Sequence, residues 1–213
     1  MSRARPVTNL LGLAVLATVV QRPMHRYEIA TTIREQGKDD DMDVKWGSLY
    51  TVVQNLERHG FVEPVGTDRQ GSRPERTIYR ITDAGRWELV EWTRDLVAKP
   101  TTEHPSFAAG LSTLAALPPE EAADLLEARL RRLEARIADR GRSLAGFAAR
   151  VPRLFLVEDE YALAMQRAEA DWVRGLLDEL RGGRFPDLAL WQQSHDTGVM
   201  SGADPPGEGA APG

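Results

Sequence analysis

The chain contains no cysteine among its 213 residues. This absence excludes disulfide bonds, thiolate zinc sites, iron–sulfur clusters and a cysteine nucleophile. The four histidines form no i,i+4 pair and no HExxH arrangement, so neither a histidine metal site nor a histidine-based catalytic triad is expected. A chain that depends on no disulfide is expected in the reducing cytoplasm, and we expect no cofactor.

Long apolar runs are also missing. The most apolar segment, Leu10–Val20, holds about 11 residues, whereas a membrane-spanning helix needs about 20. Arginines precede and follow this segment, and no clear small-residue cleavage site comes after it, which argues against a secretory signal. We therefore expect a buried helix here and no membrane partner.

A strong positive charge is absent as well, since the formal net charge is -5. Non-specific coating of nucleic acid, as by histones, depends on strong positive charge and is excluded. The acidity is uneven: residues 1–100 carry 15 basic and 14 acidic side chains, and residues 101–213 carry 12 and 18. The nearly neutral first half can therefore hold a local basic site.

The composition changes near residue 100. Segment Ala98–Pro105 reads AKPTTEHP, in which two prolines bracket polar residues, as in a linker or a sharp corner between helices. We predict one domain over residues 1–99 and a helical domain over residues 100–185. Gly, Pro, Ala, Asp and Ser dominate the end of the chain, so residues 186–213 are predicted to be a disordered tail.

The first half has the pattern of several helices followed by a hairpin. Apolar spacing and terminal glycines predict helices at about 7–20, 25–36 and 47–59, strands at 61–65 and 77–81, and a helix at 83–97. The predicted order is three helices, a two-stranded hairpin with a long tip that forms a wing, and a fourth helix.

The second half is almost wholly helical. A long helix with heptad-spaced apolar residues is predicted from about residue 118 to 151. Its stretch Arg129–Arg142 alternates with glutamates and is interpreted as a solvated face. A last helix, at about 155–180, carries an apolar seam formed by Tyr161, Met165, Ala168, Trp172 and Leu176. The predicted fold class is mainly α with a small β-hairpin wing.

The helix predicted at residues 47–59 has two chemically different faces. The apolar residues on one face are Leu49, Val52, Val53 and Leu56. The opposite face and the start of the helix carry hydrogen-bonding groups, namely Lys45, Ser48, Tyr50, Thr51, Gln54, Asn55 and Arg58. Recognition helices in the major groove of DNA present such groups to base edges. Taken alone, this pattern also fits a solvated amphipathic helix.

The tip of the predicted wing is rich in arginine. Residues 68–76 read DRQGSRPER. Arginines at such a tip can reach phosphates or the minor groove of DNA, although a solvated loop can have the same composition. The polar helix face and the basic tip, separated by one strand, together favour DNA binding.

Four motifs in the first half resemble the winged helix-turn-helix of PadR-family transcriptional regulators. They are LLGL at 10–13, PMHRYEIA at 23–30, GSLYTVVQNLER at 47–58 with GFV at 60–62, and YRITDAGR at 79–86. Their order and spacing cover nearly all of residues 10–97. Arg26 stands where the family usually has glycine, and Thr51 where proline commonly follows GSLY. The second half is similar to the helical C-terminal dimerisation domain of the longer members.

The resemblance implies a cytoplasmic, sequence-specific DNA-binding regulator that acts as a homodimer on a pseudo-palindromic operator, and specifically a ligand-responsive repressor. The predicted DNA-binding residues are Arg26, Tyr27, Lys45, Ser48, Tyr50, Thr51, Gln54, Asn55, Arg58, Arg69, Gln70, Ser72, Arg73 and Arg76. Apolar surfaces that pair across a two-fold axis predict a dimer interface containing Leu13, Leu16, Tyr161, Met165, Trp172 and Leu176. The small aromatic or hydrophobic effector that the family implies is expected near Trp92, Phe107 and Tyr161.

The sequence favours this function over two others. A winged-helix module can bind another protein and never meet DNA, but the wing arginines argue against it. An enzyme is not expected, because the sequence has no Gly-rich phosphate loop, nucleophile elbow, metal constellation or dinucleotide fingerprint. The acidic run Asp39–Asp43 lacks the glycine and distant glutamate of a calcium loop and is interpreted as solvated.

Overall fold

The computed structural model describes residues 5–37, 46–68 and 76–197. The chain divides into two compact units, Met1–Thr102 and Glu103–Gly213. Within the described ranges, no helix is long and apolar enough to cross a membrane. Helices with one small antiparallel sheet make up the structure, which confirms the predicted fold class.

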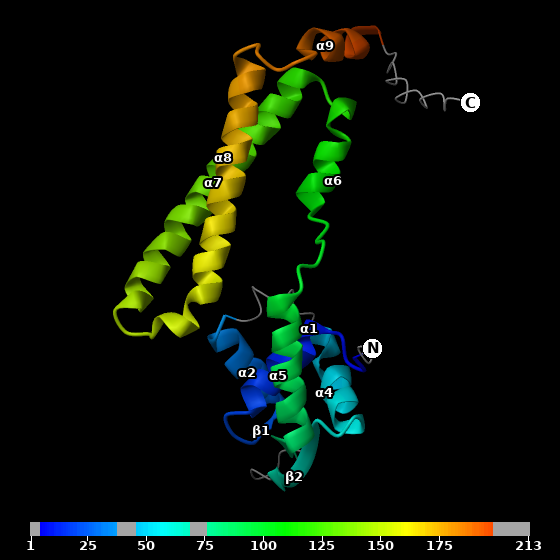
Figure 1. Ribbon diagram of the computed structural model, residues 1–213, viewed down its shortest axis with the longest axis vertical. Helices are drawn as coiled ribbons and strands as arrows, with labels where there is room; N and C mark the ends of the chain where they lie inside the picture. The colour runs from blue at the N-terminus through cyan, green and yellow to red at the C-terminus, as the bar shows by residue number, and fades with distance from the viewer. Residues whose placement is uncertain (1–4, 38–45, 69–75, 198–213) are drawn as a thin grey trace, which may run out of the picture. The chain divides into compact units, whose positions relative to one another are not determined.

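The first unit combines helices with a three-stranded antiparallel sheet (Figure 1). Its elements are α1 (Leu10–Val19), β1 (Met24–His25), α2 (Arg26–Glu35), the 3-10 turn η1 (Trp46–Ser48), α4 (Leu49–Arg58), β2 (Val62–Asp68), β3 (Arg76–Ile81) and α5 (Asp83–Ala98). The strand order is β1-β3-β2, with Met24 opposite Tyr79 and Val62 opposite Ile81. The helices and hairpin lie where the sequence predicts them, whereas β1 is an addition, because two residues show no periodicity.

Side-chain caps fix where two of these helices begin. The His25 ring accepts a hydrogen bond from the Glu28 N–H at the start of α2. Thr82 accepts one from the Gly85 N–H at the start of α5 and donates its hydroxyl to the Gly60 carbonyl at 2.6 Å. Each cap satisfies an amide that has no partner within its helix. Thr82 also ties the start of α5 to the end of α4.

Helix α1 lies at the centre of the first core. Eight of its ten residues are buried, and apolar residues of α2, α4, the sheet and α5 pack around it. Leu13 and Leu16, which the sequence analysis places at a dimer interface, are only 8% and 0% exposed. That prediction is wrong, because side chains buried within their own unit leave no surface for a partner. An evenly apolar helix gives no pattern that separates core from interface.

Trp92 of α5 belongs to the same core. It is 3% exposed, and the Arg5 guanidinium lies 4.9 Å from the centroid of its ring. Arg5 Nε also donates to Glu88 Oε1 at 2.5 Å, and Arg5 Nη2 donates to Asp95 Oδ2 at 3.2 Å. These contacts attach the segment before α1 to α5. A ring covered in this way fills the core, which is a correction to the effector-site role predicted for Trp92.

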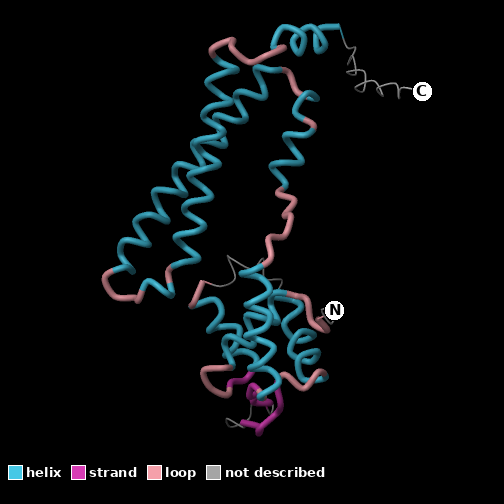
Figure 2. Tube along the Cα trace, viewed as in Figure 1, coloured by secondary structure: helices cyan, strands magenta, loops and turns pink. Residues whose placement is uncertain are grey.

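The second unit is built on a hairpin of two long helices, α7 and α8 (Figure 2). Its elements are α6 (Ser106–Ser112), η2 (Leu114–Ala116), α7 (Pro119–Ala148), η3 (Arg153–Phe155), α8 (Val157–Arg181) and α9 (Leu188–Thr197). The buried residues between α7 and α8 are Ala123, Leu126, Leu130, Leu133, Ala170, Val173 and Leu180. Pro119 at the first turn and Pro152 after the last turn set the limits of α7.

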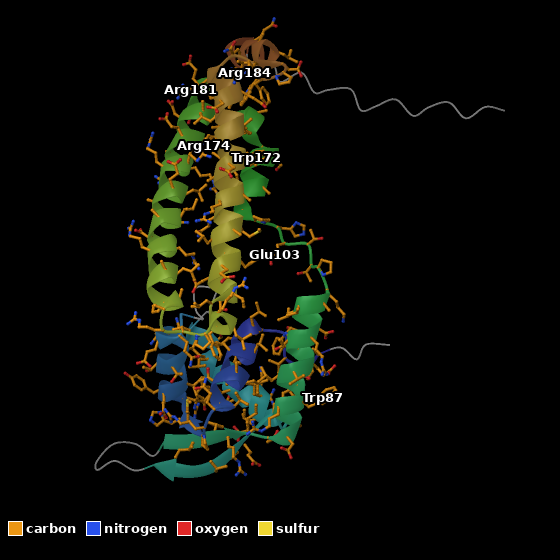
Figure 3. The ribbon with its side chains drawn as sticks, turned by 60° about the vertical axis from the view of Figure 1, so that its left-hand side comes forward. Trp87, Glu103, Trp172, Arg174, Arg181 and Arg184 are labelled. Carbon is orange, nitrogen blue, oxygen red and sulfur yellow. The ribbon has the colours of Figure 1, made fainter. Side chains whose placement is uncertain are left out.

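Ion pairs connect α7 to α8 along the hairpin. Arg174 donates to Glu134 at 2.9 Å, and Arg140 donates to Asp159 at 2.6 Å. Arg181 pairs with Asp124 of α7; Arg174 and Arg181 are labelled in Figure 3. Pairs that stay partly solvated contribute about 0 to 1 kcal/mol each. Their effect is therefore mainly to fix how the two helices are aligned, while apolar burial stabilises the hairpin.

The prediction that residues 186–213 are disordered is wrong for part of that range. Residues Leu188–Thr197 form α9, and Trp191 Nε1 donates to the Leu117 carbonyl at 2.9 Å. Trp191 also packs edge-to-face on Phe185, with ring centroids 5.9 Å apart. One tryptophan therefore anchors a segment whose overall composition is polar. Residues 198–213 lie outside the described part of the chain.

We expect Gly85→Ala to destabilise the first unit. A Cβ at this position would lie 2.0 Å from the Phe61 carbonyl oxygen and 2.9 Å from Ile81 Cγ1, well inside van der Waals contact. The free energy of unfolding, measured by urea denaturation with circular dichroism, should fall by at least about 2 kcal/mol. Gly47→Ala is the control, because a Cβ there meets nothing within 4 Å. Equal losses in both variants would contradict the steric explanation.

Candidate nucleic-acid interface

Helix α4 separates its apolar and polar side chains onto two faces. The buried face consists of Leu49, Val52, Val53 and Leu56. The opposite face consists of Tyr50, Thr51, Gln54 and Arg58, all exposed, with Asn55 half-buried at its edge. Arg58 Nη1 donates to Asn55 Oδ1 at 3.1 Å, so the two side chains lie side by side on the helix. Hydrogen-bonding groups on a rigid, exposed helix face are suited to contact with base edges.

Arg26, at the start of α2, lies against two aromatic rings. Its guanidinium carbon is 4.2 Å from the centroid of the Tyr50 ring and 5.6 Å from that of the Tyr79 ring. Its Nη1 atom is buried and has no hydrogen-bond partner among the described residues. A cation over an aromatic face is stabilising by about 0.5 to 2 kcal/mol, depending on desolvation. Arg26 therefore connects α2, α4 and β3 and holds Tyr50 on the exposed face of α4.

Tyr79 supports this arrangement from the sheet. Its side chain is 4% exposed, and burial raises the pKa of its phenol above the ordinary value. The neighbouring Arg26 charge acts in the opposite direction and has a smaller effect. The ring thus stays uncharged at neutral pH. This role of Tyr79 could not be predicted from the sequence, because only the pairing of β3 with β1 brings Tyr79 to the start of α2.

A second cation–aromatic contact lies near the N-terminal end of α4. The Arg34 guanidinium is 4.0 Å from the centroid of the Trp46 ring in η1. Ser48, half-buried, immediately precedes α4, and Tyr27 at the start of α2 is 70% exposed. Lys45 lies outside the described residues. The structure thus brings the ends of α2 and η1 together next to the exposed face of α4, although no sequence spacing indicated the Arg34 contact.

Strands β2 and β3 form the hairpin predicted as a wing, with a register shift between Pro64 and Gly66. Arg80 of β3 donates to Glu63 of β2 at 2.6 Å, so its charge is compensated within the hairpin. Arg76 begins β3. The predicted tip residues Arg69, Gln70, Ser72 and Arg73 lie outside the described residues, and their role stays a prediction.

The apolar seam predicted on α8 points away from the core of the second unit. Tyr161, Met165 and Trp172 are 66%, 48% and 52% exposed. Leu176, at the end of the seam, is half-buried and packs on the core. Val173 of the same helix is fully buried against α7. Helix α8 therefore has one apolar face that its own unit covers and another that stays in solvent.

Two of the residues predicted near an effector lie in the second unit. Phe107 of α6 packs edge-to-face on Trp172, with ring centroids 6.1 Å apart. Phe107 also lines two pockets, and Tyr161 lines neither. Trp92, the third residue of the predicted group, lies in the core of the first unit.

The described residues contain no group of three or more His, Asp or Glu side chains that could hold a metal ion. The acidic run Asp39–Asp43 lies outside them.

Part of the first unit matches a known protein family. Residues 15–91 match the transcriptional regulator PadR-like family. The negative transcriptional regulator PadR of Bacillus subtilis (strain 168) is 25% identical over 131 residues, which cover 62% of this chain and 71% of that protein.

Solved structures share the fold at lower identity. The crystal structure of Bacillus subtilis PadR in complex with operator DNA has a TM-score of 0.69 at 22% identity, covering 82% of this chain and 99% of that one. The structure of the same protein with p-coumaric acid gives 0.65 at 22% identity, covering 81% and 99%. The Vibrio cholerae virulence activator AphA gives 0.59 at 19% identity, covering 81% and 98%. Residues 15–91 are therefore similar to the PadR-like family of transcriptional regulators, and a longer stretch of the chain is similar to a PadR protein of Bacillus subtilis.

Proposed function

We propose that the chain is a cytoplasmic, DNA-binding repressor that acts as a homodimer on a pseudo-palindromic operator and releases it when a small aromatic or hydrophobic effector binds. The observation that carries this proposal is the exposed polar face of α4, fixed from behind by a buried apolar stripe. The Bacillus subtilis relative, whose crystal structure contains operator DNA, has the same fold. No catalytic activity is expected from a member of this family.

Recognition follows from the geometry of α4. Its exposed residues Tyr50, Thr51 and Gln54 would enter the major groove, where amide and hydroxyl groups can distinguish bases. The predicted arginines of the wing tip would contact phosphates, which orient the protein but carry no sequence information. Arg26 contributes from behind, because it keeps the Tyr50 ring in one orientation.

Two copies are needed to read both halves of a pseudo-palindromic operator. Their recognition helices must be about 34 Å apart to reach successive major grooves on one side of the DNA. The exposed aromatic seam of α8 is a surface through which the second units could pair. A ligand that binds one arrangement of the two copies more tightly than another increases the population of that arrangement. The distance between the two recognition helices then changes. The relative that was crystallised with p-coumaric acid supports a ligand-responsive mechanism.

We expect Tyr50→Ala and Gln54→Ala each to weaken specific operator binding by about 1 to 3 kcal/mol, because each removes a group that can contact bases. The measurement is a gel-shift titration against a footprinted operator, with random DNA in parallel. Gln21→Ala is the control, since Gln21 is exposed after the end of α1 and away from α4 in the sequence. Unchanged operator affinity in both α4 variants would contradict the role of this face in base recognition, whereas no DNA binding by the unmodified protein would favour the protein-binding module.

Arg26→Lys should weaken operator binding as much as Arg26→Ala does, by about 0.5 to 2 kcal/mol. Lysine keeps the charge but not the planar group that stacks on Tyr50. The salt dependence of binding should be the same in both variants and in the unmodified protein, because stacking releases no counterion from DNA. If lysine instead retained full affinity, and alanine lowered the salt slope by about one unit, Arg26 would be a phosphate contact.

Trp172→Asp and Met165→Asp should each shift the protein from dimer to monomer and lower operator affinity. Burying such side chains is worth about 1.5 to 3 kcal/mol each, and an aspartate at the interface reverses that gain. Sedimentation equilibrium beside a gel-shift assay measures both effects. Trp87→Asp is the control, because Trp87 is also exposed, at 64%, but lies on α5 (Figure 3). If Trp172→Asp and Met165→Asp both remained dimeric, the dimer interface would have to lie on another surface.

A further inference from the structure

A pocket of about 370 Å³ lies wholly within the second unit, between α6, η2 and α7. Its walls are mainly apolar and include Phe107, Leu111, Leu114, Leu117, Leu125 and Leu126. Three arginines of α7, Arg129, Arg132 and Arg136, complete the lining. A largely apolar cavity of a few hundred Å³ with a few convergent polar groups has the character of a small-molecule site.

The three arginines share one side of α7 because they follow a spacing of three and four residues. Arg129 is already engaged: it donates to Glu169 at 2.7 Å, and its guanidinium lies 3.6 Å from the centroid of the Phe107 ring. Arg129 thereby fastens α6 to the α7–α8 hairpin. Arg132 and Arg136 have neither an ion pair nor a hydrogen bond with any other residue in the described part of the chain.

This lack of partners contrasts with the neighbouring arginines of the same helix. Arg131 pairs with Glu127 at 2.8 Å, Arg140 pairs with Asp159, and Arg142 pairs with Asp139. The stretch Arg129–Arg142, interpreted from the sequence as a solvated face, therefore contains two kinds of arginine. Arg131, Arg140 and Arg142 are neutralised by acids of their own unit. Arg132 and Arg136, which are exposed at the edge of the pocket, have no acidic partner among the described residues.

The wall opposite α7 is held in place from behind by α9. Trp191 Nε1 donates to the Leu117 carbonyl at 2.9 Å, and a ring nitrogen of His195 lies 2.8 Å from the Ala115 carbonyl. Both carbonyls belong to the η2 region, which contributes Leu114 and Leu117 to the lining. The pocket is therefore formed before any ligand binds, which lowers the entropic cost of binding.

We propose that this pocket binds an apolar organic anion, with its acidic group between Arg132 and Arg136 and its apolar body against Leu111, Leu114 and Leu125. This inference rests on the proposed function and assigns the effector site to it. The second pocket beside Phe107, of about 520 Å³, does not offer the same chemistry, because its one arginine, Arg129, is neutralised by Glu169. The acidic group of an apolar anion can accept charge-assisted hydrogen bonds from the two unpaired guanidinium groups. A neutral molecule of the same shape forms no such bonds with them.

The position of α6 gives such a ligand a route to the DNA-binding unit. Helix α6 is the first element after the linker that follows α5, so the chain itself joins the pocket wall to the recognition domain. A ligand that bridges α6 and α7 would restrict α6 at the point where the linker enters the second unit.

The experiment compares two fluorescent probes of nearly the same shape on the intact protein. The first, 8-anilinonaphthalene-1-sulfonate, carries one negative charge, and N-phenyl-1-naphthylamine carries none. We expect Arg132→Ala combined with Arg136→Ala to weaken binding of the anionic probe by about tenfold or more, since it removes charge-assisted hydrogen bonds, while affinity for the neutral probe changes less than about twofold. Arg131→Ala is the matched control, because Arg131 lies on the same helix and is paired with Glu127.

Leu125→Asp tests the apolar wall and should weaken both probes, because Leu125 lines the pocket and is 52% exposed. Equal effects of the double variant and Arg131→Ala on the anionic probe, or no effect of either, would overturn the proposal. Circular dichroism of each variant separates loss of the site from loss of the fold.

A gel-shift assay without probe, run on the same variants, tests the proposed function independently. Unliganded operator binding should be unchanged by Arg132→Ala with Arg136→Ala, and the anionic probe should release DNA from the unmodified protein but not from this variant. Arginine-dependent probe binding in a protein that binds no operator would support the pocket and reject the repressor function. Operator binding that the bound probe leaves unchanged would reject the effector role.

Discussion

The packing of the apolar face of α4 against α1 is the contact on which the DNA-binding unit depends. Val53 and Leu56 have no exposed surface, and neither do Leu11 and Leu16 of α1. A helix buried this completely on one side cannot rotate without exposing apolar area, at a cost of about 25 cal/mol per Å². The orientation of the polar face is thus set by the core. Base recognition needs that fixed orientation, because each contact depends on atoms placed within a few tenths of an ångström.

The Arg26 cluster adds orientation to side chains that the core does not reach. Tyr50 is 56% exposed, so packing alone would leave its ring free to change rotamer. Stacking on a guanidinium that is itself held against buried Tyr79 restricts that freedom. The unsatisfied Nη1 of Arg26 is a cost of this arrangement. A residue without this side chain would provide no such support, so the orientation of the Tyr50 ring depends on Arg26 itself.

The sequence predicted the features that depend on the spacing of residues within a single segment. The buried stripe of α4, the helix ends at glycine and proline, and the hairpin all follow from spacing within one segment, and the structure confirms them. Contacts between distant segments were not predictable in this way. The pairing of β1 with β3, the Arg26–Tyr79 contact and the anchoring of α9 through Trp191 each join segments far apart in the chain.

Burial was the other quantity that the sequence could not assign. Leu16 and Trp172 are both large and apolar at helical spacing, yet the first is fully buried and the second is half exposed. The difference arises because α1 is packed against several elements of its own unit, whereas α8 packs its buried face on α7 and its Trp172 side contacts only Phe107 among the described aromatic residues. Similarly, Arg131 and Arg132 are adjacent in sequence, but only one of them has an acidic partner in reach.

Phe107 connects the exposed seam of the second unit to its arginine-lined pocket. Its ring contacts Trp172 of the exposed seam and also covers Arg129 beside the arginine-lined pocket. A ligand that displaces Phe107 therefore alters the surface through which two copies would pair. Because linkage is reciprocal, any such ligand must bind the paired and unpaired states with different affinity. A coupling of 1.4 kcal/mol would change the dimer dissociation constant by about tenfold on saturation, so effector binding and assembly cannot be independent if both use this ring.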